Sequence, residues 1–214
     1  MAFDQKTLKT LWERVDREIW IVTAAHAGRR GGLVATFVNQ ASIVPEMPRV
    51  LAGLAKTHET CALVEASGSF ALHLVDDSQL DLVWRFGLQS SREVDKLEGL
   101  RTRSAATESP ILCDAVAWLD CRVEGRLDIG DRMVYLGQVV DGQLVRDVTP
   151  LCLSRLMKLA PADKLATLRV QMEADAAKDR EAISRWRGTQ QAPNQQADPK
   201  VVPADQRRAK QREP

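Results

Sequence analysis

The sequence of 214 residues lacks the patterns that identify several large classes of proteins. None of its four cysteines belongs to a C-x-x-C pair, and their spacings suit neither a zinc site nor a disulfide framework, which predicts free thiols in a reducing compartment. No apolar run approaches the length of a transmembrane helix, and charged residues interrupt positions 1–20, where a signal peptide would need an apolar stretch. We therefore expect a cytoplasmic protein with no membrane contact.

Signature motifs of nucleotide-binding and hydrolytic enzymes are also missing. The sequence contains no G-x-x-x-x-G-K-[ST] P-loop, no G-x-G-x-x-G dinucleotide fingerprint and no G-x-S-x-G nucleophile elbow. Its three histidines, His26, His58 and His73, fall in three different predicted elements, which argues against a metal site. The formal net charge of +1 implies no general attraction to nucleic acid or to an anionic membrane.

Short apolar runs separated by turn residues dominate the chain up to about residue 146. Predicted strands lie at residues 19–25, 33–42, 50–54, 70–75, 115–123 and 133–140, and Asp141-Gly142 predicts a hairpin turn leading into residues 144–145. Predicted helices cover the N-terminal segment up to Arg17, residues 57–66 and residues 78–86, with Ser78 as a cap. Since the strands do not alternate with long helices, we expect a mainly β barrel or sandwich with flanking helices.

The C-terminal part of the chain changes character. Residues 151–159 and 161–187 have helical composition, but apolar positions in the second segment are sparse, so that helix needs a partner surface to be stable. From Gly188 onwards almost nothing is available to bury, which predicts disorder. We therefore expect one domain at 1–160, a C-terminal helix at 161–187 and a disordered tail at 188–214.

One predicted strand, within Gly31–Pro45, carries an unusual number of small polar residues. Thr36, Asn39, Gln40 and Ser42 all fall inside it. They are compatible with an edge strand that has a polar face. They are equally compatible with a backbone that approaches a planar polar ligand, since cofactor sites combine an apolar cavity with a few fixed polar groups.

An ordered set of short segments over residues 19–146 decides between these two interpretations. The set comprises Ile21-Val-Thr23, Gly32-Leu-Val-Ala-Thr36, Gln40-Ala-Ser42 before Pro45, Leu54–Thr60, Ser67–Leu74, Val94–Leu100, Pro110–Val123, Gly130-Asp-Arg132 and Leu136–Val139. In this order the segments resemble the flavin reductase-like family, the FMN-binding split β-barrels. The resemblance implies a split β-barrel with a C-terminal helical extension.

The resemblance also implies an activity, in which NAD(P)H passes a hydride to FMN, or to FAD as an alternative flavin. No catalytic side chain is expected, because the cofactor carries the reaction. The family further implies a homodimer with flavin near the interface, a partner subunit for the helix at 161–187 to wrap, and a monooxygenase that receives the reduced flavin. The sequence does not distinguish NADH from NADPH.

The resemblance assigns the flavin site to two short segments. Thr36, Phe37, Val38, Asn39 and Ser42 are expected along the isoalloxazine ring and the ribityl chain, and Lys56, Thr57, His58 and Thr60 around the phosphate. An ordinary surface lysine is the competing interpretation of Lys56. Trp84 is expected in the core or as a cover over the flavin.

Four positions depart from the family pattern. Arg132 stands where the family usually has His, His73 where it usually has Asn, and Gln40 and Val34 replace Ser and Thr. Flavin binding that uses the main chain tolerates such changes, whereas the nicotinamide side depends more on side chains. A flavin- or small-ligand-binding protein without catalytic activity is therefore the alternative function.

Overall fold

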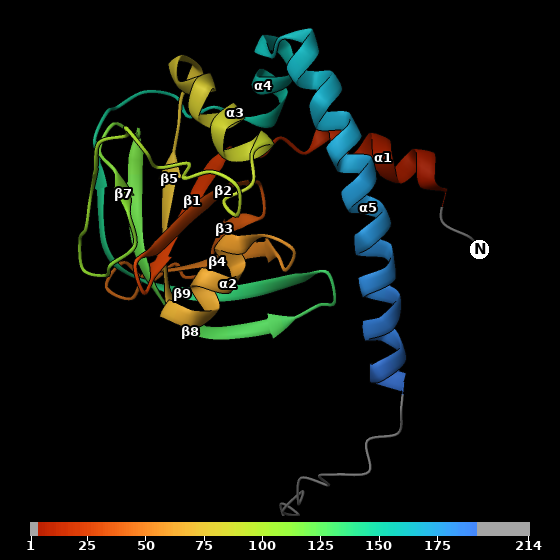
Figure 1. The fold of residues 1–214 in the computed structure, drawn as a ribbon, viewed down its shortest axis with the longest axis horizontal. Helices are drawn as coiled ribbons and strands as arrows, with labels where there is room; N and C mark the ends of the chain where they lie inside the picture. Colours follow the sequence, from red (N-terminus) through yellow and green to blue (C-terminus); the bar gives the residue numbers. More distant parts are fainter. Residues whose placement is uncertain (1–3, 192–214) are drawn as a thin grey trace, which may run out of the picture.

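A curled antiparallel sheet of seven strands forms the centre of the protein (Figure 1). The computed structural model describes residues 4–191. The sheet has the order β2-β1-β5-β8-β9-β4-β3, and every neighbouring pair is antiparallel. Its strands are β1 (Trp20–His26), β2 (Arg29–Ala35), β3 (Val38–Gln40), β4 (Arg49–Ala55), β5 (Ser69–Leu74), β8 (Ala117–Asp128) and β9 (Arg132–Leu144). A separate small pair consists of β6 (Thr102–Arg103) and β7 (Ile111–Leu112).

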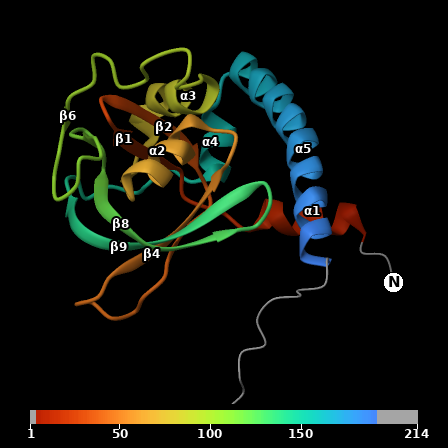
Figure 2. The same ribbon diagram turned by 60° about the horizontal axis from the view of Figure 1, so that its bottom comes forward.

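Five helices and one short 3-10 turn flank the sheet in the described part of the chain. They are α1 (Gln5–Arg14), α2 (Glu59–Ser67), η1 (Asp77–Gln79), α3 (Leu80–Leu88), α4 (Leu153–Leu159) and α5 (Ala162–Gln191). Within residues 4–191, no helix has the length and apolar character needed to cross a membrane. The long α5 runs alongside the body of the protein in both views (Figures 1 and 2).

Two apolar clusters hold these elements together. The first lies inside the curl of the sheet and joins Val22, Leu72 and Tyr135 to residues of α2. The second lies on the other face of β1, where Ile21 and Phe86 bring α3 and α4 against the sheet. Because both faces of β1 are covered, residues 21–24 are buried without alternation, as the sequence of a buried strand predicted.

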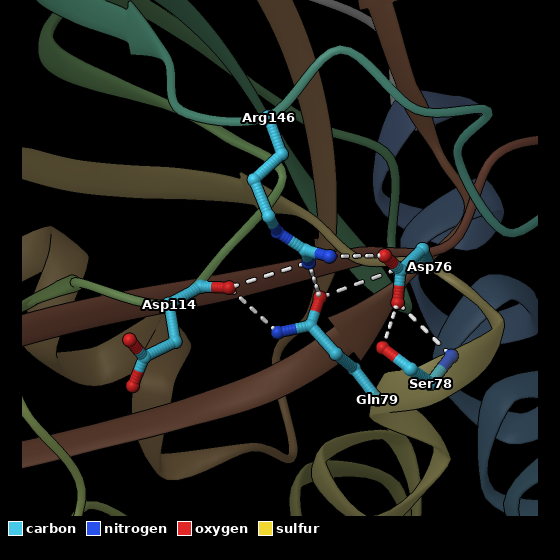
Figure 3. A network of polar contacts seen from close by, with 5 residues as sticks. All are labelled: Asp76, Ser78, Gln79, Asp114 and Arg146. Carbon is cyan, nitrogen blue, oxygen red and sulfur yellow. Dashed lines mark hydrogen bonds and ion pairs between the residues drawn. The ribbon is translucent and has the colours of Figure 1, made fainter.

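A polar network fixes the start of α3, which forms one wall of the site described below (Figure 3). The guanidinium of Arg146 donates to Asp76 Oδ2 at 2.5 Å and to Gln79 Oε1 at 3.0 Å. Gln79 in turn donates to the Asp114 carbonyl at 2.7 Å, and Asp76 accepts from the Ser78 backbone N–H and hydroxyl. The cap of this segment is therefore Asp76, and the expectation that Ser78 would be the cap is wrong.

The expected hairpin at Asp141-Gly142 is also wrong. Both residues lie inside β9, and the turn that joins β8 to β9 falls at residues 129–131. The physical reason is close packing across the pair of strands, because a Cβ on Gly142 would lie 2.9 Å from Leu119 Cδ2 and 3.1 Å from the Trp118 carbonyl. Glycine is needed here for close approach rather than for a turn.

Two element boundaries differ from expectation in ways that affect the site. The strand predicted at 33–42 is interrupted at Thr36-Phe37, so its two halves become β2 and β3, with β3 paired to β4. The C-terminal helix continues to Gln191, so the tail predicted to begin at Gly188 starts as helix, and residues 192–214 lie outside the described residues.

Candidate cofactor cavity

A cavity of about 410 Å³ opens between the sheet and three helices. This volume falls within the range of small-molecule and cofactor sites, about 300–1,000 Å³. Its walls come from the end of β2, from β4, from α3 and α4, and from α5. The lining is largely apolar, and its principal polar members are Arg17, Thr36, His58, Arg132, Gln171 and Asp175.

Phe37 presents an aromatic ring at this cavity. The chain leaves β2 at Ala35, and the Phe37 carbonyl then accepts a hydrogen bond from the Gly53 N–H at 2.8 Å, which fixes the crossing to β3. The Phe37 side chain remains 47% exposed. The guanidinium carbons of Arg17 and Arg132 lie 5.7 Å and 5.0 Å from its ring centroid. An exposed aromatic ring with cations nearby suits a planar ligand that carries acceptor atoms.

Arg17 adds an observation that points to a polar ligand. Its Nε is buried and has no hydrogen-bond partner among residues 4–191. A buried donor without a partner costs free energy, and such a donor in a cavity wall is normally satisfied by whatever fills the cavity. The chemistry of the lining therefore fits a flavin, which offers an apolar ring system with acceptor atoms at one edge.

The start of α2 lies beside Arg132, on the side of the cavity that suits an anion. His58 is the N-cap of α2 but makes no side-chain capping hydrogen bond, which leaves N–H groups of the first turn available to an anion. The pKa of His58 is lowered, first by desolvation and then by the charge of Lys96. Lys96 is 2% exposed, and its ammonium donates to the Gly32 and Phe86 carbonyls at 2.9 and 2.8 Å. Burial lowers the pKa of Lys96 to about 8.

The structure brings together some of the predicted site residues. Thr36, Phe37 and His58 line the main cavity, and Thr57 joins His58 in an adjoining space of about 270 Å³. Lys56 lies beyond them, in a further cavity of about 620 Å³ beside α5. Its ammonium is paired with the Asp128 carboxylate at 2.7–2.8 Å. A ligand phosphate would have to compete with that carboxylate for Lys56.

The remaining predicted residues are placed elsewhere. Val38, Asn39 and Ser42 line a different cavity, of about 490 Å³, beside Trp20 and Val139. Thr60 is buried in the first turn of α2 and lines neither of these cavities. The residues predicted around one flavin are thus divided in the single chain among four cavities and the interior of α2.

Several lining residues were not assigned to the site from the sequence. Trp84, expected in the core or over the flavin, packs against the second apolar cluster and also lines the main cavity. Arg132, noted only as a departure from a family pattern, lines the same cavity. His73, the other departure, is fully buried between β1 and β7, where Nδ1–H donates to the Ile21 carbonyl and Nε2 accepts from the Leu112 N–H.

Helix α5 is the least expected part of the cavity wall. In the single chain its half-buried positions lie against its own domain. Gln171 Nε2 donates to the Leu88 carbonyl at 3.1 Å, and Asp179 Oδ2 lies 3.3 Å from Arg132 Nη2. In a helix so rich in charged residues, a carboxylate such as that of Asp179 is expected to face solvent. The local sequence of α5 therefore does not predict its contact with Arg132.

The curled antiparallel sheet, its flanking helices and the cofactor-sized cavity define a flavin-binding type of split β-barrel. The family model of the flavin reductase like domain matches residues 12–157. The chain therefore belongs to the flavin reductase-like family, and the family and fold predicted from the sequence are confirmed. Helix α5 lies beyond the matched segment.

Similar proteins agree with this class. The chain is 30% identical over 154 residues to HsaB, the reductase subunit of a flavin-dependent monooxygenase from Rhodococcus jostii, covering 72% of this chain and 76% of that protein. It is 27% identical over 159 residues to a ferric-chelate reductase (NAD(P)H) from Archaeoglobus fulgidus, covering 72% and 93%. Their names agree with the predicted oxidoreductase that reduces flavin.

Two further comparisons concern structure and length. The crystal structure of nitrilotriacetate monooxygenase component B from Mycobacterium thermoresistibile superposes with a TM-score of 0.61 at 30% identity, covering 70% of this chain and 82% of that one. A diflavin flavoprotein from Synechocystis is 28% identical over 134 residues, but the chain spans only 23% of that protein's length.

Proposed function

We propose that the chain is an NAD(P)H-dependent flavin reductase that binds FMN in the cavity of about 410 Å³. The observation that carries this proposal is the composition of the cavity, where an exposed aromatic ring, apolar walls and a cationic side converge within a domain of the flavin reductase-like family. When bound, the flavin accepts a hydride from the nicotinamide and supplies the redox chemistry.

The residues of the chain bind and orient the cofactor. Phe37 offers a ring face for stacking on the isoalloxazine, while Val83 and Trp84 exclude water from the apolar wall. Arg17 complements negative charge on the reduced ring, because a guanidinium remains protonated throughout the accessible pH range. Arg132, which shares the adjoining space with His58, complements the phosphate. The N-terminal turn of α2, with His58, is the proposed phosphate position.

The experiment is a titration of the purified protein with FMN, followed by anaerobic NADH or NADPH while the visible spectrum is recorded. We expect bound flavin that bleaches with at least one nucleotide, and the faster donor identifies the physiological one. Flavin that binds but stays oxidised supports the non-catalytic alternative. Failure to bind either FMN or FAD contradicts the proposal.

A variant tests the position of the flavin. Phe37→Ala removes the stacking ring and should weaken FMN binding by about tenfold, the equivalent of about 1.4 kcal/mol. The matched control is Leu127→Ala, which removes a more exposed apolar side chain on β8, outside the cavity. Equal FMN dissociation constants for the two variants would show that the flavin binds elsewhere, for example beside Asn39 and Ser42.

The expected homodimer is part of the proposal. Helix α1 buries none of its residues, yet Leu8, Leu11, Trp12 and Val15 form an exposed apolar stripe along one face. Light scattering should report a dimer, and Leu11→Glu with Trp12→Glu should shift it toward monomer. Lys6→Glu with Thr10→Glu, on the opposite face, should not. Unchanged mass in the first variant would exclude α1 from the interface.

The cellular setting is also a proposal. All four cysteines are free, and Cys61 and Cys121 are buried, which suits a cytoplasmic protein. HsaB and nitrilotriacetate monooxygenase component B are components of monooxygenase systems, which supports a monooxygenase as acceptor of the reduced flavin. The test is whether the purified chain with NAD(P)H and FMN sustains turnover of a flavin-dependent monooxygenase that has been separated from its own reductase.

A further inference from the structure

Helix α5 contributes lining residues to the proposed flavin cavity although it is not part of the matched family domain. It runs alongside the body of the protein (Figures 1 and 2). Its half-buried positions recur at helical spacing and face the body of the protein; they include Leu168, Gln171, Asp175, Asp179, Ala182 and Trp186. Gln171 fastens one end through its hydrogen bond to the Leu88 carbonyl. Trp186 covers the β8–β9 turn at the other end, where a Cβ added to Gly130 would lie 3.0 Å from its side chain.

The centre of this contact is acidic, where an apolar side chain would be expected. Asp175 and Asp179 are both half-buried, and Asp175 lines the cavity together with His58 and Arg132. Asp179 Oδ2 lies 3.3 Å from Arg132 Nη2, and Asp131 Oδ2 lies 3.3 Å from Arg132 Nε. The guanidinium that the cavity offers to an anion is therefore already held between two carboxylates. Burying a carboxylate costs free energy, so this placement requires a reason.

We propose that α5 is an autoinhibitory lid, in which Asp175 and Asp179 compete with the phosphate of FMN for Arg132, beside the start of α2. The inference rests on the proposed function and adds a regulation of the same site. A carboxylate and a phosphate repel each other at the same cation, so flavin binding and the closed position of α5 oppose one another. The apparent FMN affinity is then lowered by the fraction of molecules in which α5 is closed.

The contact that holds α5 is suited to release. It consists of one ion pair, one side-chain hydrogen bond to a backbone carbonyl and a few half-buried side chains, and Met172 and Val170 remain exposed. Elements with few buried apolar contacts open at a small fraction of the free energy of global unfolding. FMN, or a partner that binds α5, can therefore shift the helix without unfolding the barrel.

The test compares full-length variants that differ in charge on α5. Asp175→Asn with Asp179→Asn should tighten the FMN dissociation constant, measured by flavin fluorescence quenching, by about tenfold. Glu173→Gln with Glu181→Gln is the control, because it removes the same number of charges at exposed positions and should leave the constant within about twofold. Riboflavin lacks the phosphate, so its dissociation constant should fall much less than that of FMN when the first variant replaces the wild type.

A second measurement follows the helix directly. Hydrogen exchange of the α5 amides at residues 171–186 should become faster when FMN is added to the wild-type chain, because bound flavin displaces the lid. Slower exchange would mean that α5 closes over bound flavin, and a looser dissociation constant in the Asn variant would mean that the carboxylates help to bind it. Either result overturns the lid.

If wild type binds and reduces FMN but the Asn variant binds it equally well, only the lid fails. If no variant binds flavin, the proposed function fails as well.

Discussion

His73 should make the stability of the protein fall sharply in mild acid. Its ring is fully buried, and both nitrogens are committed in the neutral form, because Nδ1–H donates to the Ile21 carbonyl at 3.0 Å and Nε2 accepts from the Leu112 N–H at 3.1 Å. A proton on Nε2 would face another N–H. Desolvation lowers the pKa of His73 to about 4.

The magnitude follows from linkage between protonation and folding. The unfolded chain takes up a proton at a pKa of about 6.5, whereas the folded chain takes it up only at about 4, so stability is complete above the first value and is lost as the pH falls toward the second. Between about pH 7 and about pH 5 the two binding curves differ by an integrated free energy of about 2 kcal/mol. This is a large share of the stability of an ordinary domain.

The assay is urea unfolding followed by tryptophan fluorescence at both pH values. His73→Asn carries no titrating group at this position, so it should be less stable near neutral pH but should lose about 2 kcal/mol less than wild type on acidification. His26→Asn is the matched control, because His26 is exposed at the end of β1 and its replacement should leave the acid sensitivity of wild type intact. If His73→Asn and wild type lose the same free energy between the two pH values, the buried neutral histidine is not the cause and the reasoning is wrong.

Three further substitutions test the packing around the cavity by urea unfolding. Lys96→Met removes the donor to two buried carbonyls and should cost about 2 kcal/mol; a loss below about 0.5 kcal/mol would mean that water replaces the ammonium. Arg146→Ala leaves Asp76 without its guanidinium partner and should cost about 1–2 kcal/mol, whereas Arg122→Ala, whose nearest carbonyl is 3.5 Å away, should cost much less. Gly137→Ala places a Cβ 2.7 Å from Phe70 Cζ and should cost about 1–3 kcal/mol, and an unchanged midpoint would contradict the close approach.

The sequence predicted most of the fold because the barrel strands carry strong local signals. The run from Ile19 to Ala25 is apolar and partly β-branched, and it forms the doubly covered β1. The failure at Asp141-Gly142 shows the limit of such signals, since the same dipeptide serves a turn or a close contact across two strands. Only the position of Leu119 on the partner strand decides between them.

The candidate site was predicted where it depends on a continuous segment and missed where distant segments meet. Thr36, Phe37 and His58 reach the cavity because they follow β2 or precede α2. The family resemblance grouped Asn39 and Ser42 with them, whereas in the single chain the crossing at Phe37 carries the following strand to another cavity. The contact of Asp179 with Arg132 joins residues 47 positions apart, and no local pattern encodes it.

The strand order has a consequence for how the chain is synthesised. The sheet consists of two halves, β2-β1-β5 and β4-β3, which are joined only through β8 and β9. Until residues 117–144 have left the ribosome, β4 and β5 each present an open edge, and the inner faces of both halves remain exposed. Closure of the barrel must wait for the late hairpin, so the nascent chain carries unpaired strand edges for longer than a sheet built from successive hairpins would.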